Sequence, residues 1–426
     1  MKTSLMGKFL YGSLFVILLP ILLAAWARAT SGIVLLPVFA NENAGFIAAG
    51  MGIMLMALGM HALVIHGKGL PMNAYPPPIL VKQGIYRLLP HPIYTGCCLC
   101  AIGLSIIFQS PSGLWLVSPT LMLGCMALVY GYERDDLRAR FGDAAMTRPH
   151  LSLPSGASGK ATPAERLSVY LLVFLPWLVL YEAVIMLGAP PDARSNAMPF
   201  EQSVPVIEWT ELFYASVYAF VLIVPLLPLT SRALRAFAIR GLVLSAMGTF
   251  CFLTIPFIAP WRPFVPEGLF GNLLQFERSN DGITAAFPST HVMWAMLAAH
   301  TWSRVFPKGK KIWWILCAAI TVSCFTTGMH TIADVIGGVI AGALVLRIDA
   351  VWEVIRSNTE RLANSWHEWR IGSMRVINHG GYTALGSFAG LCIVGSIVGS
   401  AALTEMLIVA LFSLVGAGMW AQIVEG

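Results

Sequence analysis

Long apolar stretches recur along the whole chain and constrain its fold more than any other feature of the sequence. A helix needs about 20 predominantly apolar residues to cross the hydrocarbon core of a bilayer. Stretches of about that length occur at residues 8–27, 44–65, 93–110, 113–132, 167–188, 210–229, 237–259, 288–305, 312–327, 331–350, 381–399 and 402–422. They predict an all-α polytopic membrane protein with about twelve transmembrane helices.

The composition agrees with a membrane protein and argues against a soluble globule. The chain is 57% hydrophobic and 11% charged, whereas a soluble domain carries roughly 25% charged residues. All eight cysteines lie in apolar stretches, without the spacing of a metal site or a disulfide framework, so we interpret them as small buried hydrophobic residues. The net charge of +6 fits an ordinary membrane topology and requires no nucleic-acid partner.

The basic residues predict the orientation of the chain, because cytosolic loops of membrane proteins are enriched in Lys and Arg. Every second loop is basic, and the loops between them are short or acidic, such as 189–209 and 260–287. This alternation predicts a multi-pass protein of the cell inner (plasma) membrane with both termini in the cytosol. The first span also fits a signal peptide, which would leave the rest of the topology unchanged. The basic residues of the cytosolic loops are Lys68, Lys82, Arg87, Arg134, Arg138, Arg140, Arg232, Arg235, Arg240, Arg304, Lys308, Lys310, Lys311, Arg356, Arg361, Arg370 and Arg375.

Breaks in the apolar pattern divide the chain into blocks of four, six and two helices. A cytosolic linker rich in Pro, Ser, Gly and Ala separates the first two blocks. A segment with tryptophans among arginines precedes the last two helices, and it fits an interfacial helix or a solvated connector equally well. The predicted segments are 1–143, the linker 144–166, the six-helix domain 167–350, the cytosolic interfacial segment 351–380 and the C-terminal helical hairpin 381–426.

Polar motifs in the six-helix block all fall at its external face. One helix begins at Pro288-Ser289-Thr290-His291, and the last begins near His330, with Asp334 four residues later. Ionisable residues at membrane depth are costly and point to function. We expect Ser289 and Thr290, with the free N–H groups of the first helical turn, to form an anion seat. Because His330 and Asp334 are four residues apart, we expect them to share one helical face, where the carboxylate orients the imidazole.

This constellation resembles the type 2 phosphatidic acid phosphatase superfamily over roughly residues 167–350. That family's pattern is Lys-x6-Arg-Pro, Pro-Ser-Gly-His and Ser-Arg-x5-His-x3-Asp on six membrane helices. Three positions depart from it, because Ile255 stands in place of the lysine, Thr290 in place of the glycine and Cys324 in place of the third-motif arginine. The matching positions are Arg262-Pro263, Pro288-Ser289, His291, Ser323, His330 and Asp334.

The resemblance implies an integral-membrane lipid phosphate phosphatase that acts at the external (periplasmic) face and uses no metal. His330 would attack phosphorus to form a phosphohistidine, with His291 as general acid and then base. Arg262 would neutralise the phosphate oxygens, and Arg278 in the same loop could support it. The same His-His-Asp core also serves a sphingolipid-synthase-like phosphotransferase that passes a phospho-headgroup to a lipid alcohol. A transporter and a pseudoenzyme scaffold are further alternatives, although a transporter should carry its polar site near the midplane.

The N-terminal block contains a second set of motifs at the cytosolic face. Gly84-Ile85-Tyr86-Arg87 is followed by His91-Pro92-Ile93-Tyr94-Thr95-Gly96 and, after a predicted hairpin, by Glu133 and Phe141-Gly142. The pattern resembles the isoprenylcysteine carboxyl methyltransferase and phospholipid methyltransferase group. That resemblance implies an S-adenosylmethionine site, with His91 and Glu133 near the cofactor and Arg87 and Tyr94 beside them. Pro90 replaces the family's arginine, so both an active methyltransferase and a retained scaffold stay open.

Overall fold

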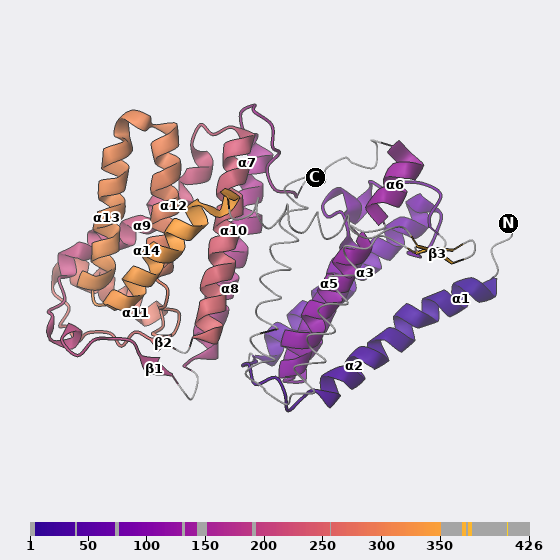
Figure 1. The fold of residues 1–426 in the computed structure, drawn as a ribbon, viewed down its shortest axis with the longest axis horizontal. Helices are drawn as coiled ribbons and strands as arrows, with labels where there is room; N and C mark the ends of the chain where they lie inside the picture. The colour runs from indigo at the N-terminus through magenta and orange to yellow at the C-terminus, as the bar shows by residue number, and fades with distance from the viewer. Residues whose placement is uncertain are drawn as a thin grey trace. The chain divides into compact units, whose positions relative to one another are not determined.

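The chain folds into helices that form two separate units (Figure 1). The first unit comprises Met1–Leu151 and Val354–Gly426, and the second comprises Ser152–Glu353. The predicted C-terminal hairpin 381–426, apart from Leu407, and most of the segment 351–380 lie outside the described residues. In this computed structural model the described residues are 5–38, 41–72, 76–129, 133–142, 151–189, 193–255, 257–350, 369–371, 374–376 and 407.

In the first unit, helices α3 (Glu42–Gly67) and α4 (Pro92–Ile107) pack closely through glycine residues. A Cβ atom on Gly52 would lie 2.5 Å from the carbonyl oxygen of Gly96, and one on Gly103 would lie 2.4 Å from the amide nitrogen of Ala49. Small residues at these positions therefore allow the close backbone approach that membrane helices use for packing. The helices of this unit are α1 (Leu5–Ser13), α2 (Leu19–Ala29), α3 (Glu42–Gly67), α4 (Pro92–Ile107), α5 (Ser118–Leu128) and α6 (Arg134–Phe141).

In the second unit, helix α12 lies at the centre and packs on α9, α10, α13 and α14. Its side chains are buried over most of its length, and the Trp294 ring contacts those of Phe174 and Phe237. Between α7 and α8, a π-helical turn at Tyr170–Phe174 continues the helix. The helices of this unit are α7 (Pro163–Val169), α8 (Leu175–Leu187), α9 (Glu211–Leu222), α10 (Ser231–Thr254), α11 (Gly268–Asn280), α12 (Thr290–Val305), α13 (Lys310–Thr326) and α14 (Ile332–Leu346).

Two glycines bring the start of α12 against α14. A Cβ atom on Gly337 would lie 2.6 Å from the Phe287 ring, and one on Gly338 would lie 2.7 Å from the carbonyl oxygen of Ser289. The same approach lets the Ser289 amide donate a hydrogen bond to the carbonyl oxygen of Asp334 (3.0 Å). The polar start of α12 and the polar start of α14 are therefore held together.

Five helices are long and apolar enough to cross a membrane by length and composition. Three shorter apolar helices accompany them in the described part of the chain. The mostly helical fold fits a polytopic membrane protein, whereas the predicted count of about twelve spans is not reached among the described residues. The five long segments are Lys8–Ala29, Glu42–Gly67, Pro163–Leu187, Glu208–Leu226 and Ser231–Leu253.

Two loops contain structure that the sequence analysis did not predict. The loop 260–287 holds the thirteen-residue helix α11 (Gly268–Asn280). Strands β1 (Arg194–Ser195) and β2 (Phe257–Ile258) pair in parallel, so they tie the loop before α9 to the loop after α10.

Six residues of the segment 351–380, for which an interfacial helix and a solvated connector were both expected, form two short strands. Strand β3 (Trp369–Ile371) pairs antiparallel with β4 (Met374–Val376), with Ile371 opposite Met374.

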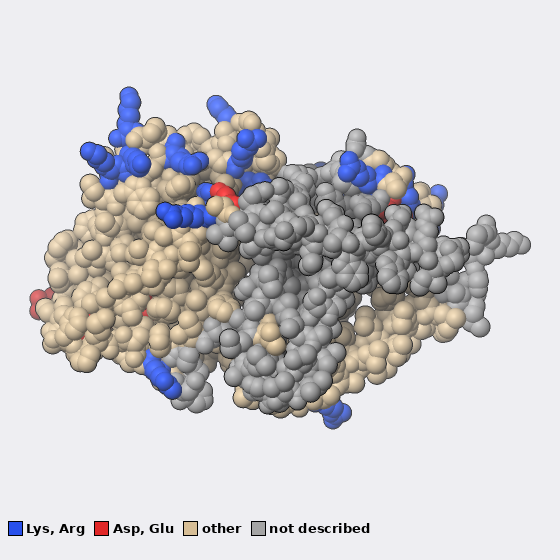
Figure 2. Space-filling view, in the orientation of Figure 1, with Lys and Arg blue, Asp and Glu red and all other residues tan. Residues whose placement is uncertain are grey.

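Basic side chains of the second unit gather at one end of its helices (Figure 2). The turn between α12 and α13 lies at that end (Figure 1) and contains Lys308. The residues that follow α13 and precede α14, from Thr327 to Thr331, lie at the opposite end of the same helices. The unit therefore has a basic end and, at its other end, the polar motifs.

Candidate active site

A capping box fixes the start of α14 and places the predicted nucleophile just outside the helix. The Thr331 hydroxyl accepts a hydrogen bond from the Asp334 amide (3.2 Å), and the Thr331 amide donates to Asp334 Oδ2 (2.9 Å). The helix begins at Ile332, because these reciprocal bonds satisfy its first free N–H groups. The expectation that His330 lies on the helix is wrong, since it lies in the preceding turn.

Gly328 allows this turn to form. Its φ angle is +71°, a left-handed conformation that glycine adopts without steric cost. A Cβ atom at this position would also lie 2.9 Å from Arg278 Nη2. The turn brings His330 Nδ1 to 3.6 Å from Asp334 Oδ2, and both side chains are buried. The predicted pair is therefore adjacent, through the turn and not through a shared helical face.

His291, 39 residues earlier in the chain, meets His330 across the helix interface. It lies in the first turn of α12, which begins at Thr290 and not at Pro288 as predicted. The atoms His291 Nδ1 and His330 Nε2 are 3.5 Å apart, and the ring centroids are 5.6 Å apart. The fold thus brings together all three residues predicted to carry the chemistry.

Two tyrosines of α9 enclose the His291 ring. Tyr214 stacks on it, with ring centroids 4.5 Å apart, and its Oη is 3.4 Å from His291 Nδ1. Tyr218 Oη is 3.4 Å from His291 Nε2. The sequence analysis did not predict either residue, because two tyrosines four residues apart on an apolar helix are also typical of ordinary helix packing.

The chemistry of these groups assigns a direction to the hydrogen bonds between them. If Nδ1 of His330 carries the proton that faces Asp334, then Nε2 of the same neutral ring is bare. The proton between the two histidines then belongs to His291 Nδ1, and Nε2 of neutral His291 accepts from the Tyr218 hydroxyl. The hydrogen bonds of His291 to Tyr218 and His330 are long (3.4 and 3.5 Å), and His330 Nδ1 lies just beyond hydrogen-bond distance of Asp334. Catalytic contacts are often this long before substrate binds. A phosphorus atom entering between the rings would meet a bare nitrogen on one side and an N–H donor on the other.

Asn196 completes the surroundings of Asp334 and was also not predicted. Its side-chain nitrogen donates to Asp334 Oδ1 (2.6 Å), and its side-chain oxygen accepts from the Thr331 hydroxyl (3.1 Å). It directly follows β1 in the loop before α9, 138 residues from Asp334 in the chain. No short-range sequence pattern connects the two positions.

The two arginines predicted to bind phosphate hold backbone carbonyl groups. Arg262 donates to the carbonyl oxygens of Val204 (2.9 Å) and Phe325. Arg278, which lies on α11, donates to those of Arg262 (2.8 Å) and Thr327 (2.9 Å). Burial, and then repulsion from Arg262, lower the pKa of Arg278 to about 10, so it stays charged at neutral pH. These contacts brace the turn that carries His330, and phosphate binding by either arginine stays a prediction.

Ser289 and Thr290, the predicted anion seat, are buried. The Ser289 hydroxyl lies 3.9 Å from Cys324 Sγ, and its amide is already bonded to Asp334. The Thr290 methyl group would be 3.1 Å from a Cβ atom on Gly248 of α10. Both side chains therefore contact neighbouring helices, and anion binding by this turn stays a prediction. Among the described residues, no group of three or more His, Cys, Asp or Glu side chains has a metal-binding arrangement.

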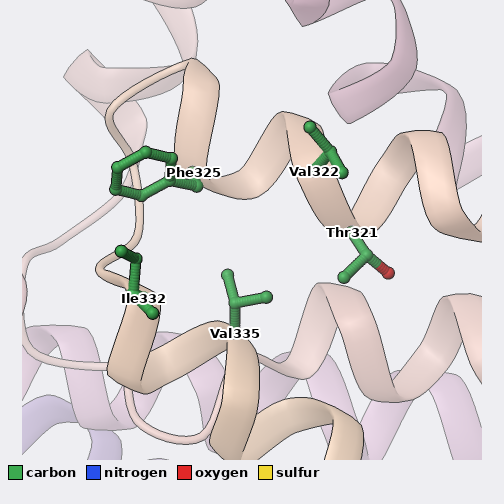
Figure 3. A pocket seen from close by; sticks show the side chains of 5 residues that line it. All are labelled: Thr321, Val322, Phe325, Ile332 and Val335. Atoms are coloured by element: carbon green, nitrogen blue, oxygen red, sulfur yellow. The ribbon is translucent and has the colours of Figure 1, made fainter. Parts of the chain in front are cut away.

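An apolar hollow of about 190 Å³ lies between α13 and α14 near the site (Figure 3). The guanidinium carbon of Arg262 lies 4.4 Å from the ring centroid of Phe325, which is one of the lining side chains. Two others, Ile332 and Val335, flank Thr331 and Asp334 in the sequence. The lining residues are Thr321, Val322, Phe325, Ile332 and Val335.

In the first unit, the structure brings His91 and Glu133 together. His91 Nδ1 and Glu133 Oε2 are 3.8 Å apart, and the Tyr94 ring centroid is 6.1 Å from that of His91. Arg87 ends a short 3₁₀ helix that begins at Gly84. Burial lowers the pKa of His91 to about 4 and raises the pKa of Glu133 to about 7.

A cation would fit beside Glu133. The Glu133 carboxyl group has a hydrogen bond from Tyr94, but its buried Oε2 atom accepts none and lies 3.8 Å from His91 Nδ1. A positive charge beside this oxygen would be favourable. The sulfonium and ammonium groups of S-adenosylmethionine are of that kind. Glu133 and His91 are the residues that would hold this cofactor.

Comparisons with known proteins agree with the motifs in both blocks. Residues 177–348 match the family model of the PAP2 superfamily, and residues 41–144 match that of phospholipid methyltransferase. No curated protein and no solved structure matches the chain. The two families and the apolar helices together indicate a membrane enzyme that modifies lipids. The chain therefore joins a phospholipid methyltransferase family segment, residues 41–144, to a PAP2 superfamily segment, residues 177–348.

Proposed function

We propose that the second unit is a lipid phosphate phosphatase that works through a phosphohistidine at His330. The observation that carries this proposal is the row formed by Asp334, His330 and His291, with contacts of 3.6 Å and 3.5 Å. A carboxylate that orients one imidazole, which faces a second imidazole, supplies a nucleophile and a proton donor at adjacent positions.

In the first step, His330 Nε2 attacks phosphorus and the bond from phosphorus to the lipid oxygen breaks. His291, once it has gained a proton at Nε2 and become an imidazolium, gives its Nδ1 proton to the leaving alkoxide, so a lipid alcohol departs. Asp334 stabilises the positive charge that develops on His330. In the second step, neutral His291 takes a proton from water as the water oxygen attacks phosphorus. The phosphorus–nitrogen bond breaks, phosphate leaves, and both histidines return to their starting forms.

The substrate we propose is an amphiphilic phosphate ester. His330 and His291 lie at the ends of apolar helices, where a bilayer lipid presents its headgroup. The hollow lined by Phe325, Ile332 and Val335 (Figure 3) adds an apolar surface at the start of α14, the helix that carries Asp334. Phosphatidate, phosphatidylglycerol phosphate, polyprenyl phosphates and sphingolipid phosphates all share this chemistry.

We further propose that the reaction occurs at the external (periplasmic) face of the inner membrane. The basic end of the second unit, which includes Lys308, Lys310 and Lys311, lies opposite the end that carries His330 (Figures 1 and 2). By the enrichment of Lys and Arg in cytosolic loops, the histidines then face outward and both termini lie in the cytosol.

A lipid phosphotransferase is the second candidate, and the contacts of Cys324 favour it. This residue replaces the family's arginine, and its buried sulfur lies 3.9 Å from the Ser289 hydroxyl. Arg262 and Arg278 are bonded to backbone carbonyl groups. With Cys324 in place of an arginine, and with Arg262 and Arg278 bonded to carbonyl groups, the site has fewer cations available to bind phosphate. The space that they leave could hold a phospho-headgroup and a lipid alcohol, which would accept the phosphoryl group in place of water.

Supplying or withholding a lipid alcohol distinguishes these two reactions. We expect purified protein in metal-chelating buffer to release inorganic phosphate from a long-chain lipid phosphate without an added acceptor. A phosphotransferase would release little phosphate until a lipid alcohol such as ceramide or diacylglycerol is added, and it would then form a new phospholipid, visible by thin-layer chromatography. If neither inorganic phosphate nor a new phospholipid forms from any of the candidate lipid phosphates, the transporter or scaffold alternatives would be favoured.

For the first unit, we propose S-adenosylmethionine binding at Glu133 and His91. The ionised form of Glu133 attracts the cofactor's cationic groups, and the pKa of this carboxyl is raised to about 7. The affinity for S-adenosylmethionine is therefore expected to increase about tenfold for each unit that pH rises towards 7, and to stay constant above pH 7. The reason is that only the ionised form of Glu133 attracts the cation. His91, with a pKa of about 4, stays neutral in this range and adds no pH dependence.

Calorimetric titration with S-adenosylmethionine between about pH 5.5 and pH 8.5 would measure this dependence. In Glu133→Gln, the affinity should be low at every pH. The matched control is Glu42→Gln, because Glu42 begins α3 in the same unit and is exposed. Equal affinity at all pH values in wild type and Glu133→Gln would contradict this assignment, and absence of binding would favour a retained scaffold.

A further inference from the structure

Asn196 links the loop before α9 to the carboxylate that faces His330. Both polar atoms of its amide are bonded, the nitrogen to Asp334 Oδ1 (2.6 Å) and the oxygen to the Thr331 hydroxyl (3.1 Å). These bonds close a ring, because Thr331 and Asp334 also bond each other in the capping box.

The ring determines which carboxylate oxygen is available to His330. Asp334 Oδ1 accepts from Asn196, and Oδ2 accepts from the Thr331 amide (2.9 Å) and lies 3.6 Å from His330 Nδ1. Because each oxygen has its own donor, the carboxylate cannot rotate without breaking a buried hydrogen bond. The side chain of Asp334 is fully buried, so its Oδ1 atom depends on the donor that Asn196 supplies.

The position of Asn196 is itself fixed by the pairing of two loops. It follows β1, whose residue Ser195 pairs with Ile258 of β2. Arg262 lies four residues beyond Ile258 and bonds the carbonyl group of Phe325, just before the turn that carries His330. The pairing therefore places an amide donor and an arginine next to the segment that carries His330.

We propose that Asn196 is a positioning residue that keeps Asp334 ionised and aimed at His330, and so sets the tautomer of the nucleophile. This inference rests on the proposed phosphohistidine reaction at the same site. Residues that orient a functional ligand or base typically change activity by 10–100-fold when they are removed. The corresponding loss in Asn196→Ala should fall on kcat, with KM nearly unchanged, because Asn196 lies behind Asp334 and does not face the phosphate.

The variant Asn196→Asp gives the sharper test, because it places a second carboxyl group against Asp334. Two adjacent carboxylates cannot both ionise readily, so the pair retains one proton to a higher pH than either group alone. When that proton is present, the new carboxylic acid donates to Asp334 Oδ1 as the amide did. Activity relative to wild type should therefore recover at low pH and fall as pH rises. Asn196→Ala has no such donor and should show a low relative activity at every pH.

The pH–rate profiles of wild type, Asn196→Asp and Asn196→Ala on one long-chain lipid phosphate measure this effect. The control is Gln202→Ala, which removes another amide of the same loop that lies 3.5 Å from the carbonyl oxygen of Pro260. Recovery at low pH in Asn196→Asp alone is the expected result. Profiles of unchanged shape in all three substitutions would overturn the proposal.

A second measurement needs no activity and separates this inference from the proposed function. If Asn196 acts through Asp334, the loss in melting temperature of Asn196→Ala, Asp334→Ala and the double variant should not be additive. The double variant should melt close to Asp334→Ala. Additive losses would overturn the positioning role even in an active enzyme. If wild type releases no phosphate from any lipid, the proposed reaction fails, and the melting data still decide whether Asn196 supports Asp334.

Discussion

Replacing His330 by alanine is expected to abolish phosphate release, with a fall in kcat of about 10⁴-fold or more. The reason is that the proposed reaction has no other nucleophile. His330 Nε2 is the ring nitrogen that faces His291, while Nδ1 faces Asp334. Phosphate release from a panel of lipid phosphates, in metal-chelating buffer, measures the loss. Wild type quenched during turnover with a ³²P-labelled substrate should carry acid-labile label, and His330→Ala should carry none.

The half-buried His300 provides the control for this substitution. His300 lies on the same helix as His291, towards the end of α12 at Arg304, and it belongs to no motif. His300→Ala should therefore release phosphate at a rate close to that of wild type. Melting temperature and gel filtration in detergent would show that both variants fold. Retention of substantial turnover by folded His330→Ala would refute the phosphohistidine mechanism.

Replacing His291 by alanine is expected to separate the two steps of the reaction. On a lipid phosphate, kcat should fall by about 10²–10⁴-fold, because the alkoxide then leaves without a proton. On 4-nitrophenyl phosphate, the leaving group needs no proton, so the first step should still proceed. The second step lacks the base that activates water. The variant should therefore release one nitrophenol per active site in a rapid burst and then stall as the phosphohistidine.

Rapid mixing with absorbance detection would resolve this burst, and acid-labile label would identify the stalled form. His330→Ala is the matched control, since it should give no burst and no labelled protein. A variant of His291 that turns over both substrates steadily, without a burst, would contradict the proposed role of His291. Loss of the burst in folded His291→Ala would indicate that His291 is needed before phosphorus is attacked.

The candidate site could largely be predicted from local spacing. Ionisable residues within apolar membrane segments are costly, so His291, His330 and Asp334 stand out in this sequence without any structural information. The prediction for the cysteines was correct only in part, because Cys317 and Cys324 are buried and the other five described cysteines are half-buried. Both family resemblances, which rest on these short motifs, are confirmed over 41–144 and 177–348.

Other parts of the site depend on contacts between distant segments. Helix α11 forms in a loop whose sequence shows no long apolar stretch. On this helix, Arg278 donates a hydrogen bond to the carbonyl oxygen of Thr327, a contact that the sequence does not predict. Tyr214 and Tyr218 gain a role only because α9 packs on α12. None of these relations has a fixed spacing in the sequence.

The sequence by itself determined the membrane class, the two family segments and the three residues of the proposed reaction, because bilayer thickness and the cost of buried charge act on local composition. Only the tertiary structure decided that His330 reaches Asp334 from a turn. It also decided that Asn196 holds the far side of that carboxylate. The physical reason is that a hydrogen bond depends on the positions of two atoms within a few tenths of an ångström, and helix packing and strand pairing set those positions across 138 residues of chain.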